Sequence, residues 1–327
     1  MRCKYYKCFM LGINVFKDFF LKSKYYSFQY AIYYAMCGLG SHIWFLRYLN
    51  YWGLKRKTIW MNKYFIDNYS HIINKYFNYE PKTEICDKYN IWVFWAQGEK
   101  NMPKLVKACY QNLCKLNGDD VKLLTMDNLG EYVELPQYVF EKLEKGLLSY
   151  THFSDILRLS LLSKYGGMWL DATCWIAKKI PDDVKNMSFW SCKTDNKNIP
   201  FWSNSMWTTW ALATNKRNML IFSFVRDMLL EHAKKEDYWI DYLLQDYLLF
   251  FASQNFDECR CNIENLRENN LKRRKLWLLM EKKYDKNKYL EITRDTWVFK
   301  LSYKTQLAKK TKNGEDTFYG RLFKCKL

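Results

Sequence analysis

Residues 153–173 read FSDILRLSLLSKYGGMWLDAT, and this stretch decides the expected fold. Its first part has the apolar spacing of a helix, the two glycines stop that helix, and the apolar triplet after them forms a short strand. Asp171 follows the strand directly. Because ligands of open α/β sheets gather outside the carboxyl ends of strands, we expect Asp155, Arg158 and Asp171 to lie close together at the edge of a sheet.

The sequence before this stretch predicts a parallel β–α–β unit. An apolar strand at 91–95 is followed by a helix at 103–116 and a second strand at 121–125. The further elements that we expect are helices at 137–149, 151–165, 218–234 and 239–253, and strands at 168–171, 189–192, 275–280 and 296–301. The fold class is therefore α/β, with an open mixed sheet flanked by helices.

The N-terminal region differs from the rest of the chain in charge. Residues 1–66 contain 11 Lys or Arg and one acid, Asp18, and are rich in Tyr, Phe and Trp. This composition indicates an anionic, partly apolar partner, and an anionic membrane surface is favoured over nucleic acid because no nucleic-acid-binding motif is present. We predict a helical membrane-associating region at 1–85, a second domain at 86–327, and a cytoplasmic protein held peripherally at the inner membrane face.

Residues 25–46 carry no charge and have the length of a membrane span. Polar residues interrupt this segment, however, and its glycines would weaken a helix. A span is therefore less favoured than an interfacial or groove-forming pair of helices. The segment also lacks the compact apolar core and cleavage site of a signal peptide.

The eleven cysteines form no paired framework. Cys259 and Cys261 are the only close pair, and no histidine lies near them in sequence, so a zinc site is weakly supported. Reduced, buried thiols in a cytosolic protein are the favoured interpretation.

Two interpretations fit the central carboxylates and the arginine. Ser154, Asp155 and Arg158 could be a helix cap with an intrahelical ion pair, and Asp171 could hydrogen-bond a turn. The glycine stop and the following strand favour a binding site instead, in which Asp171 holds a metal-bridged pyrophosphate or sugar hydroxyls.

These motifs resemble the sugar-transferase region with a DxD motif that is shared by capsular polysaccharide synthesis proteins, yeast-type mannosyltransferases and glucosylating clostridial toxins. The bacterial capsular polysaccharide synthesis branch is the most similar. The resemblance covers about residues 88–252, includes Trp-Ala-Gln-Gly at 95–98, and continues more thinly at 299–304. It implies a GT-A fold and a nucleotide-diphospho-sugar donor, with a UDP-sugar favoured.

The resemblance also implies roles for individual residues. Asp155 and Arg158 would hold the sugar and phosphate of the donor, Trp95 would stack on its base, and Asp171 would be the first acid of the DxD motif. The donor-binding residues implied are Trp95, Gln97, Gly98, Ser154, Asp155, Arg158, Gly167, Asp171, Thr173, Lys300 and Lys304.

The chain departs from the DxD pattern at Thr173, where the second acid is missing. Coordination of Mn²⁺ or Mg²⁺ by Asp171 is therefore doubtful. Either another acid, for which Asp246 is the candidate, supplies a ligand and joins Asp171 and Arg158 in catalysis, or Lys300 and Lys304 neutralise the leaving pyrophosphate.

Three further residues have side chains suited to binding or catalysis. Trp202 and Asn204 could cradle an acceptor sugar by stacking and hydrogen bonding, or could belong to an ordinary loop. His152 could be a base, although packing at the start of the helix is favoured.

The expected function is that of a glycosyltransferase acting on a growing capsular or other surface glycan, for which a lipid-linked form is one candidate. One alternative is a non-catalytic scaffold that binds sugar nucleotides or glycans in a polysaccharide-assembly complex. The other is a basic nucleic-acid-binding protein, which would leave the cluster at 155–171 unexplained and is not expected.

Overall fold

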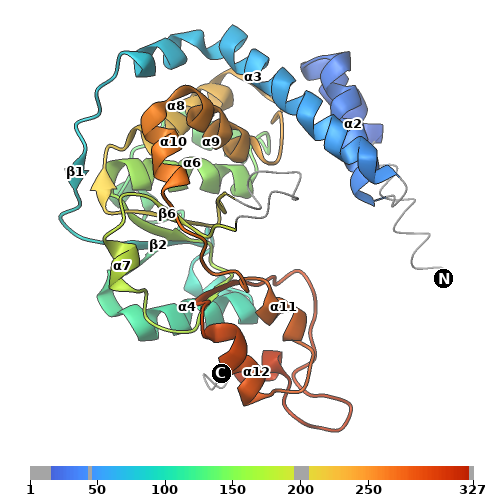
Figure 1. The fold of residues 1–327 in the computed structure, drawn as a ribbon, viewed down its shortest axis with the longest axis vertical. Coiled ribbons are helices and arrows are strands. Elements are labelled where there is room, and N and C mark those ends of the chain that lie inside the picture. The colour runs from blue at the N-terminus through green and yellow to red at the C-terminus, as the bar shows by residue number, and fades with distance from the viewer. Residues whose placement is uncertain (1–15, 43–45, 195–205, 324–327) are drawn as a thin grey trace.

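The computed structural model describes residues 16–42, 46–194 and 206–323 (Figure 1). Its helices are α2 (Phe28–His42), α3 (Arg47–Phe77), α4 (Lys104–Asn117), α5 (Gln137–Glu144), α6 (Tyr150–Tyr165), α7 (Asp182–Lys185), α8 (Leu220–Lys235), α9 (Leu244–Asn255), α10 (Asp257–Glu264), α11 (Lys275–Leu279), α12 (Lys286–Thr293) and α13 (Phe318–Leu322). Its strands are β1 (Glu84–Ile85), β2 (Ile91–Phe94), β3 (Val121–Leu124), β4 (Gly167–Leu170), β5 (Cys174–Ile176), β6 (Trp190–Ser191), β7 (Ala211–Thr214), β8 (Lys216–Arg217) and β9 (Val298–Lys300).

The main sheet has the strand order β3-β2-β4-β7-β6. β2 pairs in parallel with both β3 and β4, whereas β7 runs antiparallel to β4 and β6. The prediction of an open mixed sheet flanked by helices is confirmed. Two small sheets accompany it, and the β5–β9 pair matters for the site because it continues the chain beyond β4.

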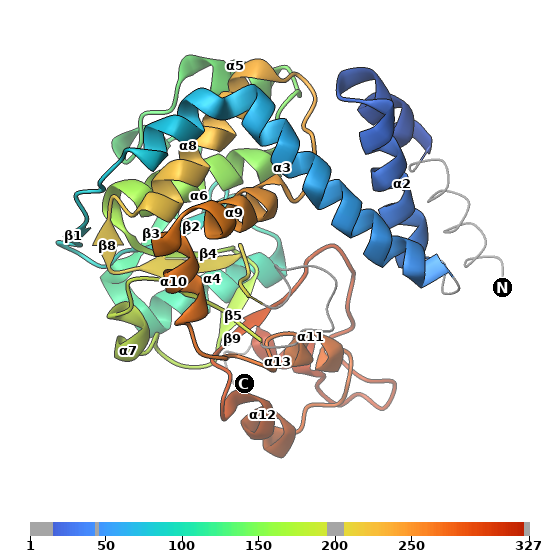
Figure 2. The ribbon, with the colours of Figure 1, turned by 45° about the horizontal axis from the view of Figure 1, so that its top comes forward.

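Helix α4 joins β2 to β3, as the predicted β–α–β unit requires. All four residues of β2 and all four of β4 are buried, which is typical of strands covered on both faces. Figures 1 and 2 show α6, α8 and α9 on one side of the sheet and α4 on the other. The carboxyl ends of β2 and β4 therefore open at one edge of a layered α/β body.

The N-terminal helices α2 and α3 pack against each other, and α3 also packs against α8 and α9. The inner face of α3 buries Met61 and Phe65, and its backbone leaves helical geometry at Tyr69, which is buried as well. Helix α2 stands away from the sheet (Figure 1). The predicted helical character of this region agrees with the structure where the structure describes it, over residues 16–42 and 46–77, and the division from the rest of the chain at residue 85 stays a prediction.

Three predicted elements differ from the structure. The predicted strand at 275–280 is wrong, because this segment forms helix α11, which buries Leu276 and the following Met280 on one side. The predicted helix at 137–149 already ends at Glu144, and Gly146 follows with φ +69°. The helix predicted from 239 begins only at Leu244, after a non-helical segment that forms part of the candidate site.

The cysteines of the described residues are free thiols, and Cys109, Cys174, Cys192 and Cys259 are buried, whereas Cys261 is exposed. Burial raises the pKa of Cys109 to about 12, so this thiol stays protonated near neutral pH. In residues 16–42, 46–194 and 206–323, no helix is both long enough and apolar enough to cross a membrane.

Candidate active site

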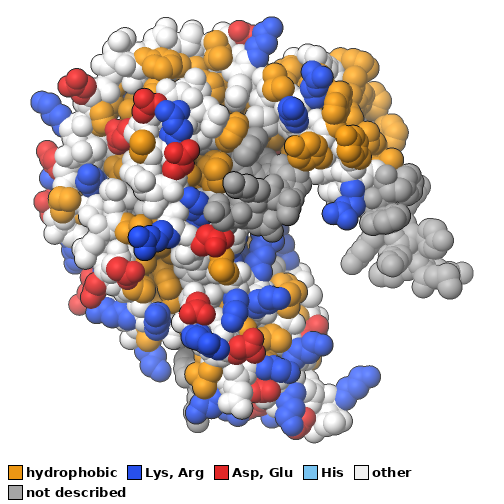
Figure 3. Space-filling model, in the orientation of Figure 1, with side chains coloured by type: hydrophobic (Ala, Val, Ile, Leu, Met, Phe, Trp, Pro, Cys, Tyr) orange, Lys and Arg blue, Asp and Glu red, His pale blue; other side chains and the backbone are white. Residues whose placement is uncertain are grey.

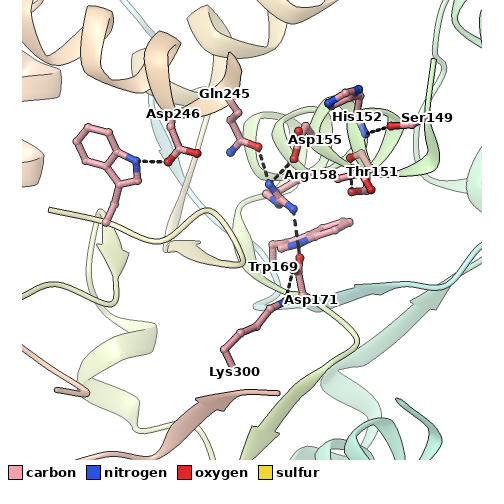
Figure 4. Close-up of polar contacts among 12 residues, drawn as sticks. Ser149, Thr151, His152, Asp155, Arg158, Trp169, Asp171, Gln245, Asp246 and Lys300 are labelled. Carbon is pink, nitrogen blue, oxygen red and sulfur yellow. Dashed lines mark hydrogen bonds and ion pairs between the residues drawn. The ribbon is translucent and has the colours of Figure 1, made fainter. Parts of the chain in front are cut away.

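Arg158 is the centre of a buried polar cluster at the edge of the main sheet (Figure 4). Its guanidinium donates to Asp155 Oδ1 at 2.8 Å, to Gln245 Oε1 at 2.5 Å and to Asp171 Oδ1 at 3.2 Å. The same group lies 4.9 Å from the ring centroid of Trp169. The predicted grouping of Asp155, Arg158 and Asp171 is thus present, and Gln245 joins it from α9.

The local sequence explains why these side chains meet. Ser149 caps α6 by accepting from the backbone N–H of His152, so Asp155 and Arg158 lie one turn apart in the body of the helix. The prediction that Ser154 caps this helix is wrong, because the helix begins earlier and the Ser154 hydroxyl donates to the carbonyl of Thr151. A short β4 then carries the chain to Asp171, beneath the same face of α6.

Gly167 makes the turn from α6 into β4 possible. Its φ is +85°, and a Cβ atom at this position would lie 2.2 Å from the backbone oxygen of Asn90. Both observations require a glycine. Gly167 therefore supports the site through the backbone at the start of β4, while Asp171 follows the opposite end of that strand.

Asp171 is held between two cations. Its Oδ1 accepts from Arg158 and, at 2.9 Å, from the indole N–H of Trp169, while its Oδ2 accepts from Lys300 Nζ at 2.5 Å. Lys300 arrives on β9, which pairs antiparallel with β5 and places Lys300 opposite Cys174. Burial alone would raise the pKa of Asp171, but the attraction of Lys300 and Arg158 outweighs it and lowers that pKa.

Asp155 responds differently to its surroundings. Burial raises the pKa of Asp155 to about 6, against the attraction of Arg158 and with a further upward contribution from Asp171. The two carboxylates therefore differ in their protonation. Asp171 is ionised throughout the neutral pH range, whereas Asp155 takes up a proton as the pH falls through about 6.

A cleft of about 380 Å³ opens over this cluster. Three cationic side chains (Arg158, Arg274 and Lys300) and three carboxylates (Asp155, Asp171 and Asp246) line it, together with aromatic and hydroxyl-bearing residues that include Trp210, Tyr242, Thr208 and Thr209. Such a lining suits a ligand that carries both negative charge and hydroxyl groups.

Helix α9 contributes two buried polar side chains to the cleft. Asp246 is 3% exposed and accepts from the indole N–H of Trp207 at 2.9 Å. Gln245 is 2% exposed, and its amide oxygen is bound to Arg158. Among the described residues, the amide nitrogen of Gln245 has no hydrogen-bond partner. A buried donor of this kind costs free energy unless a ligand accepts from it.

The other residues implied by the resemblance lie outside the lining of the cleft. Trp95 packs edge-to-face against Tyr303, with ring centroids 5.5 Å apart. Gln97 and Lys304 are exposed, Gly98 has φ +76°, and the backbone oxygen of Thr173 accepts from Leu301. Trp202 and Asn204 lie outside the described residues.

His152 packs at the start of α6. Its ring stacks on Trp239 with centroids 4.6 Å apart, and burial lowers its pKa to about 4. His152 is therefore neutral near pH 7, as the packing interpretation requires.

The described residues do not fit a divalent cation at Asp171. Each oxygen of this carboxylate already accepts from a cationic side chain, and the nearby position that could add a second acid is Thr173. Asp246, the other candidate ligand, accepts from Trp207. Within the described ranges there is no group of three or more His, Cys, Asp or Glu residues with the geometry to hold a metal.

Sequence reasoning missed Gln245, Arg274 and Tyr242. Gln245 precedes Asp246, and Arg274 belongs to the basic run at 272–275. The sequence therefore shows polar side chains suited to a binding site in both segments. No periodic or motif signal connects either segment with residues 155–171. Only the packing of α9 and of the segment before α11 brings them to the cleft.

The comparisons with known proteins point to one family. The sequence profile described as "Capsular polysaccharide synthesis protein" matches residues 49–322. The chain is 30% identical over 103 residues to the O-glycosyltransferase PaGT of Phomopsis amygdali and to the O-glycosyltransferase braB of Annulohypoxylon truncatum. These alignments cover 28% of this chain and 25% and 24% of the two relatives, so the chain spans about a quarter of their length.

A solved structure of the PaToxG glycosyltransferase is also similar, at 17% sequence identity. The match covers 64% of this chain and 83% of that one, with a TM-score of 0.38.

Proposed function

The chain belongs to the capsular polysaccharide synthesis protein family, and from this premise we propose that it is a glycosyltransferase. The proposed donor is a nucleotide-diphospho-sugar, with UDP as the favoured nucleotide, and the proposed acceptor is a capsular or other surface glycan. The mixed sheet would then be of the GT-A type. The observation that carries the proposal is the cluster in which Asp155, Asp171 and Gln245 hold Arg158 beside Lys300, at the edge of the sheet.

Each part of the cleft has a role in this reaction. The bond between the anomeric carbon and the diphosphate breaks, and its electron pair stays on the leaving phosphate oxygen. Lys300 and Arg274 supply positive charge for that oxygen, and Arg158 supports it from within the buried cluster. The acceptor hydroxyl forms the new bond to the anomeric carbon, and its proton passes to the departing diphosphate or to water. The buried Asp155 and Gln245 would orient the hydroxyls of the sugar.

Donor hydrolysis tests the proposal most directly. Purified full-length protein would be incubated with a panel of UDP-, GDP- and CMP-sugars, and release of free nucleotide would be measured. We expect release from at least one donor. Binding of a donor by calorimetry without any release would support the non-catalytic scaffold instead, and neither binding nor release would contradict the proposed function.

The same assay tests the role of metal. Because Lys300 and Arg158 occupy both oxygens of Asp171, we expect a chelator to change the rate of donor hydrolysis by less than about threefold. The control is the rate after addition of Mn²⁺ or Mg²⁺ to the chelated enzyme. Loss of activity with chelator, restored by added metal, would show that a cation binds where the described residues offer no free carboxylate pair.

The raised pKa of Asp155 predicts how the rate depends on pH. With a pKa of about 6, the carboxylate is charged above pH 6 and loses its charge as the pH falls through that value. Its ion pair with Arg158 is lost in the same range, so we expect donor hydrolysis to decline below about pH 6. In Asp155→Asn this step should disappear and the slower residual rate should be flat. A wild-type rate that stays constant from pH 7 to pH 5 would contradict the assignment.

A further inference from the structure

An apolar stripe runs along the solvent-exposed side of α3. Tyr48, Trp52, Ile59 and Ile66 are 82%, 39%, 56% and 52% exposed. Their spacings of four and seven residues place them on one face of the helix. An ordinary amphipathic surface helix packs its apolar face inward and presents a polar face to water, whereas α3 has large apolar side chains on its outer face as well.

The neighbouring helix repeats the pattern. Phe28, Ile32 and Leu39 of α2 are 63%, 37% and 39% exposed and also share one helical face. In the helical residues before α2, Phe16 and Phe20 are 69% and 67% exposed. Figure 3 shows apolar side chains gathered over the part of the surface where α2 lies. We call these exposed residues of 16–66 the apolar stripe.

The opposite face of α3 is already occupied. Met61, Phe65 and Tyr69 are buried against the body, and Lys57 forms a buried ion pair with Asp241 at 2.9 Å. The apolar stripe therefore cannot turn inward without breaking these contacts. It is available to a partner outside the described part of the chain.

Positive charge is interleaved with the stripe. Lys55 and Lys63 are exposed on the same face of α3, and the guanidinium of Arg56 lies 5.0 Å from the ring centroid of Trp52. Residues 16–66 contain eight Lys or Arg and a single acid, Asp18. A partner must therefore accept aromatic and aliphatic side chains while it carries negative charge.

We propose that the apolar stripe of α2, α3 and residues 16–20 docks this protein onto the surface of an anionic lipid bilayer. Tyr, Trp and Phe side chains suit the headgroup region, and exposed Lys and Arg pair with anionic lipids. A second copy of the chain fits the stripe less well, because it would bring a second surface of the same positive charge against the first. The docking is independent of the proposed transferase activity, and it would place the cleft close to lipid-linked acceptors.

Co-sedimentation with vesicles tests this inference on the full chain without any donor. Vesicles of phosphatidylcholine alone would be compared with vesicles that contain about 30% phosphatidylglycerol. We expect binding at least tenfold tighter to the anionic vesicles, because each basic residue near such a surface adds to the attraction. The triple variant Tyr48→Ser, Trp52→Ser, Ile59→Ser should lower that binding at least about tenfold, and Lys55→Glu with Lys63→Glu should remove the preference for anionic lipid.

A matched control is available away from the apolar stripe. Ile85, Leu278 and Leu290 are 63%, 65% and 54% exposed, so their joint replacement by serine removes similar exposed apolar surface elsewhere. This control should bind vesicles as the wild type does, and thermal unfolding would check that both triple variants fold. Equal binding by the stripe variant and the wild type would overturn the proposal. Self-association of the wild type that the stripe variant abolishes, without vesicle binding, would also overturn it and assign the stripe to a second copy.

Discussion

Replacing Asp171 by asparagine is expected to lower the rate of donor hydrolysis by about 100- to 1,000-fold. The carboxylate accepts from Arg158 on one oxygen and from Lys300 on the other, so it holds two cations in a fixed arrangement at the edge of the sheet. An amide has nearly the same shape, but it offers only one acceptor oxygen and carries no charge. One of the two cations would lose its bond to residue 171, and the pair would no longer be held together toward the leaving diphosphate.

The measurement is kcat and KM for the donor that the wild type hydrolyses fastest. We expect most of the loss in kcat, because the arrangement of the cations acts on charge that develops as the sugar–phosphate bond breaks. Asp120→Asn is a matched control, since Asp120 also forms an ion pair with a lysine, Lys185, at 3.1 Å and does not line the cleft. A variant at Asp171 that folds and keeps more than a tenth of the wild-type rate would contradict the role assigned to this residue.

The sequence predicts those parts of the site whose residues lie near one another along the chain, and misses those that lie far apart in it. Asp155 and Arg158 lie in one helix, and Asp171 directly follows the next strand, so helical spacing and the glycine turn are enough to place them together. Gln245 and Arg274 reach the same cleft from segments far along the chain. Their positions depend on packing between whole elements, which no local pattern encodes.

The errors in the predicted elements have the same origin. Residues 275–280 are a short apolar run that suits a strand or a helix, and the burial of Leu276 and Met280 on one side decides for a helix.

The stacking role implied for Trp95 remains a prediction, and the structure places this ring against Tyr303.

The segment before α9 shows why the N-terminal helices matter for the cleft. Tyr242 and Leu243 line the cleft. The residues just before them form hydrogen bonds with the N-terminal region. Lys22 donates to the backbone oxygens of Trp239 and Ile240 at 2.8 and 2.5 Å. The helices that carry the apolar stripe thus also hold one wall of the candidate active site.

Lys57→Met is expected to lower the free energy of unfolding by about 3–5 kcal/mol, the range found when one partner of a buried ion pair is removed. The side chains of Lys57 and Asp241 are 6% and 4% exposed. The variant would leave the buried carboxylate of Asp241 with Lys22 as the one remaining cation of the two that lower its pKa. Burial alone would raise the pKa of Asp241. In the wild type, the attraction of Lys57 and Lys22 outweighs burial, and the pKa is lowered. Without Lys57, Asp241 would have to take up a proton or draw water into the contact between α3 and the cleft wall.

Two further variants separate this effect from a general loss of charge. Lys75→Met on the same helix breaks an ion pair with Asp227 of similar length, 2.8 Å, whose lysine is 56% exposed, and it should cost less than about 1 kcal/mol. The double variant Lys57→Met, Asp241→Leu should recover part of the stability, because it removes both charges of the pair. The recovery is incomplete because Asp241 also balances the buried Lys22 and accepts from the backbone N–H of Leu243. Urea denaturation of the four proteins gives the comparison. If Lys57→Met and Lys75→Met cost the same, the buried pair does not hold the N-terminal helices to the wall of the cleft.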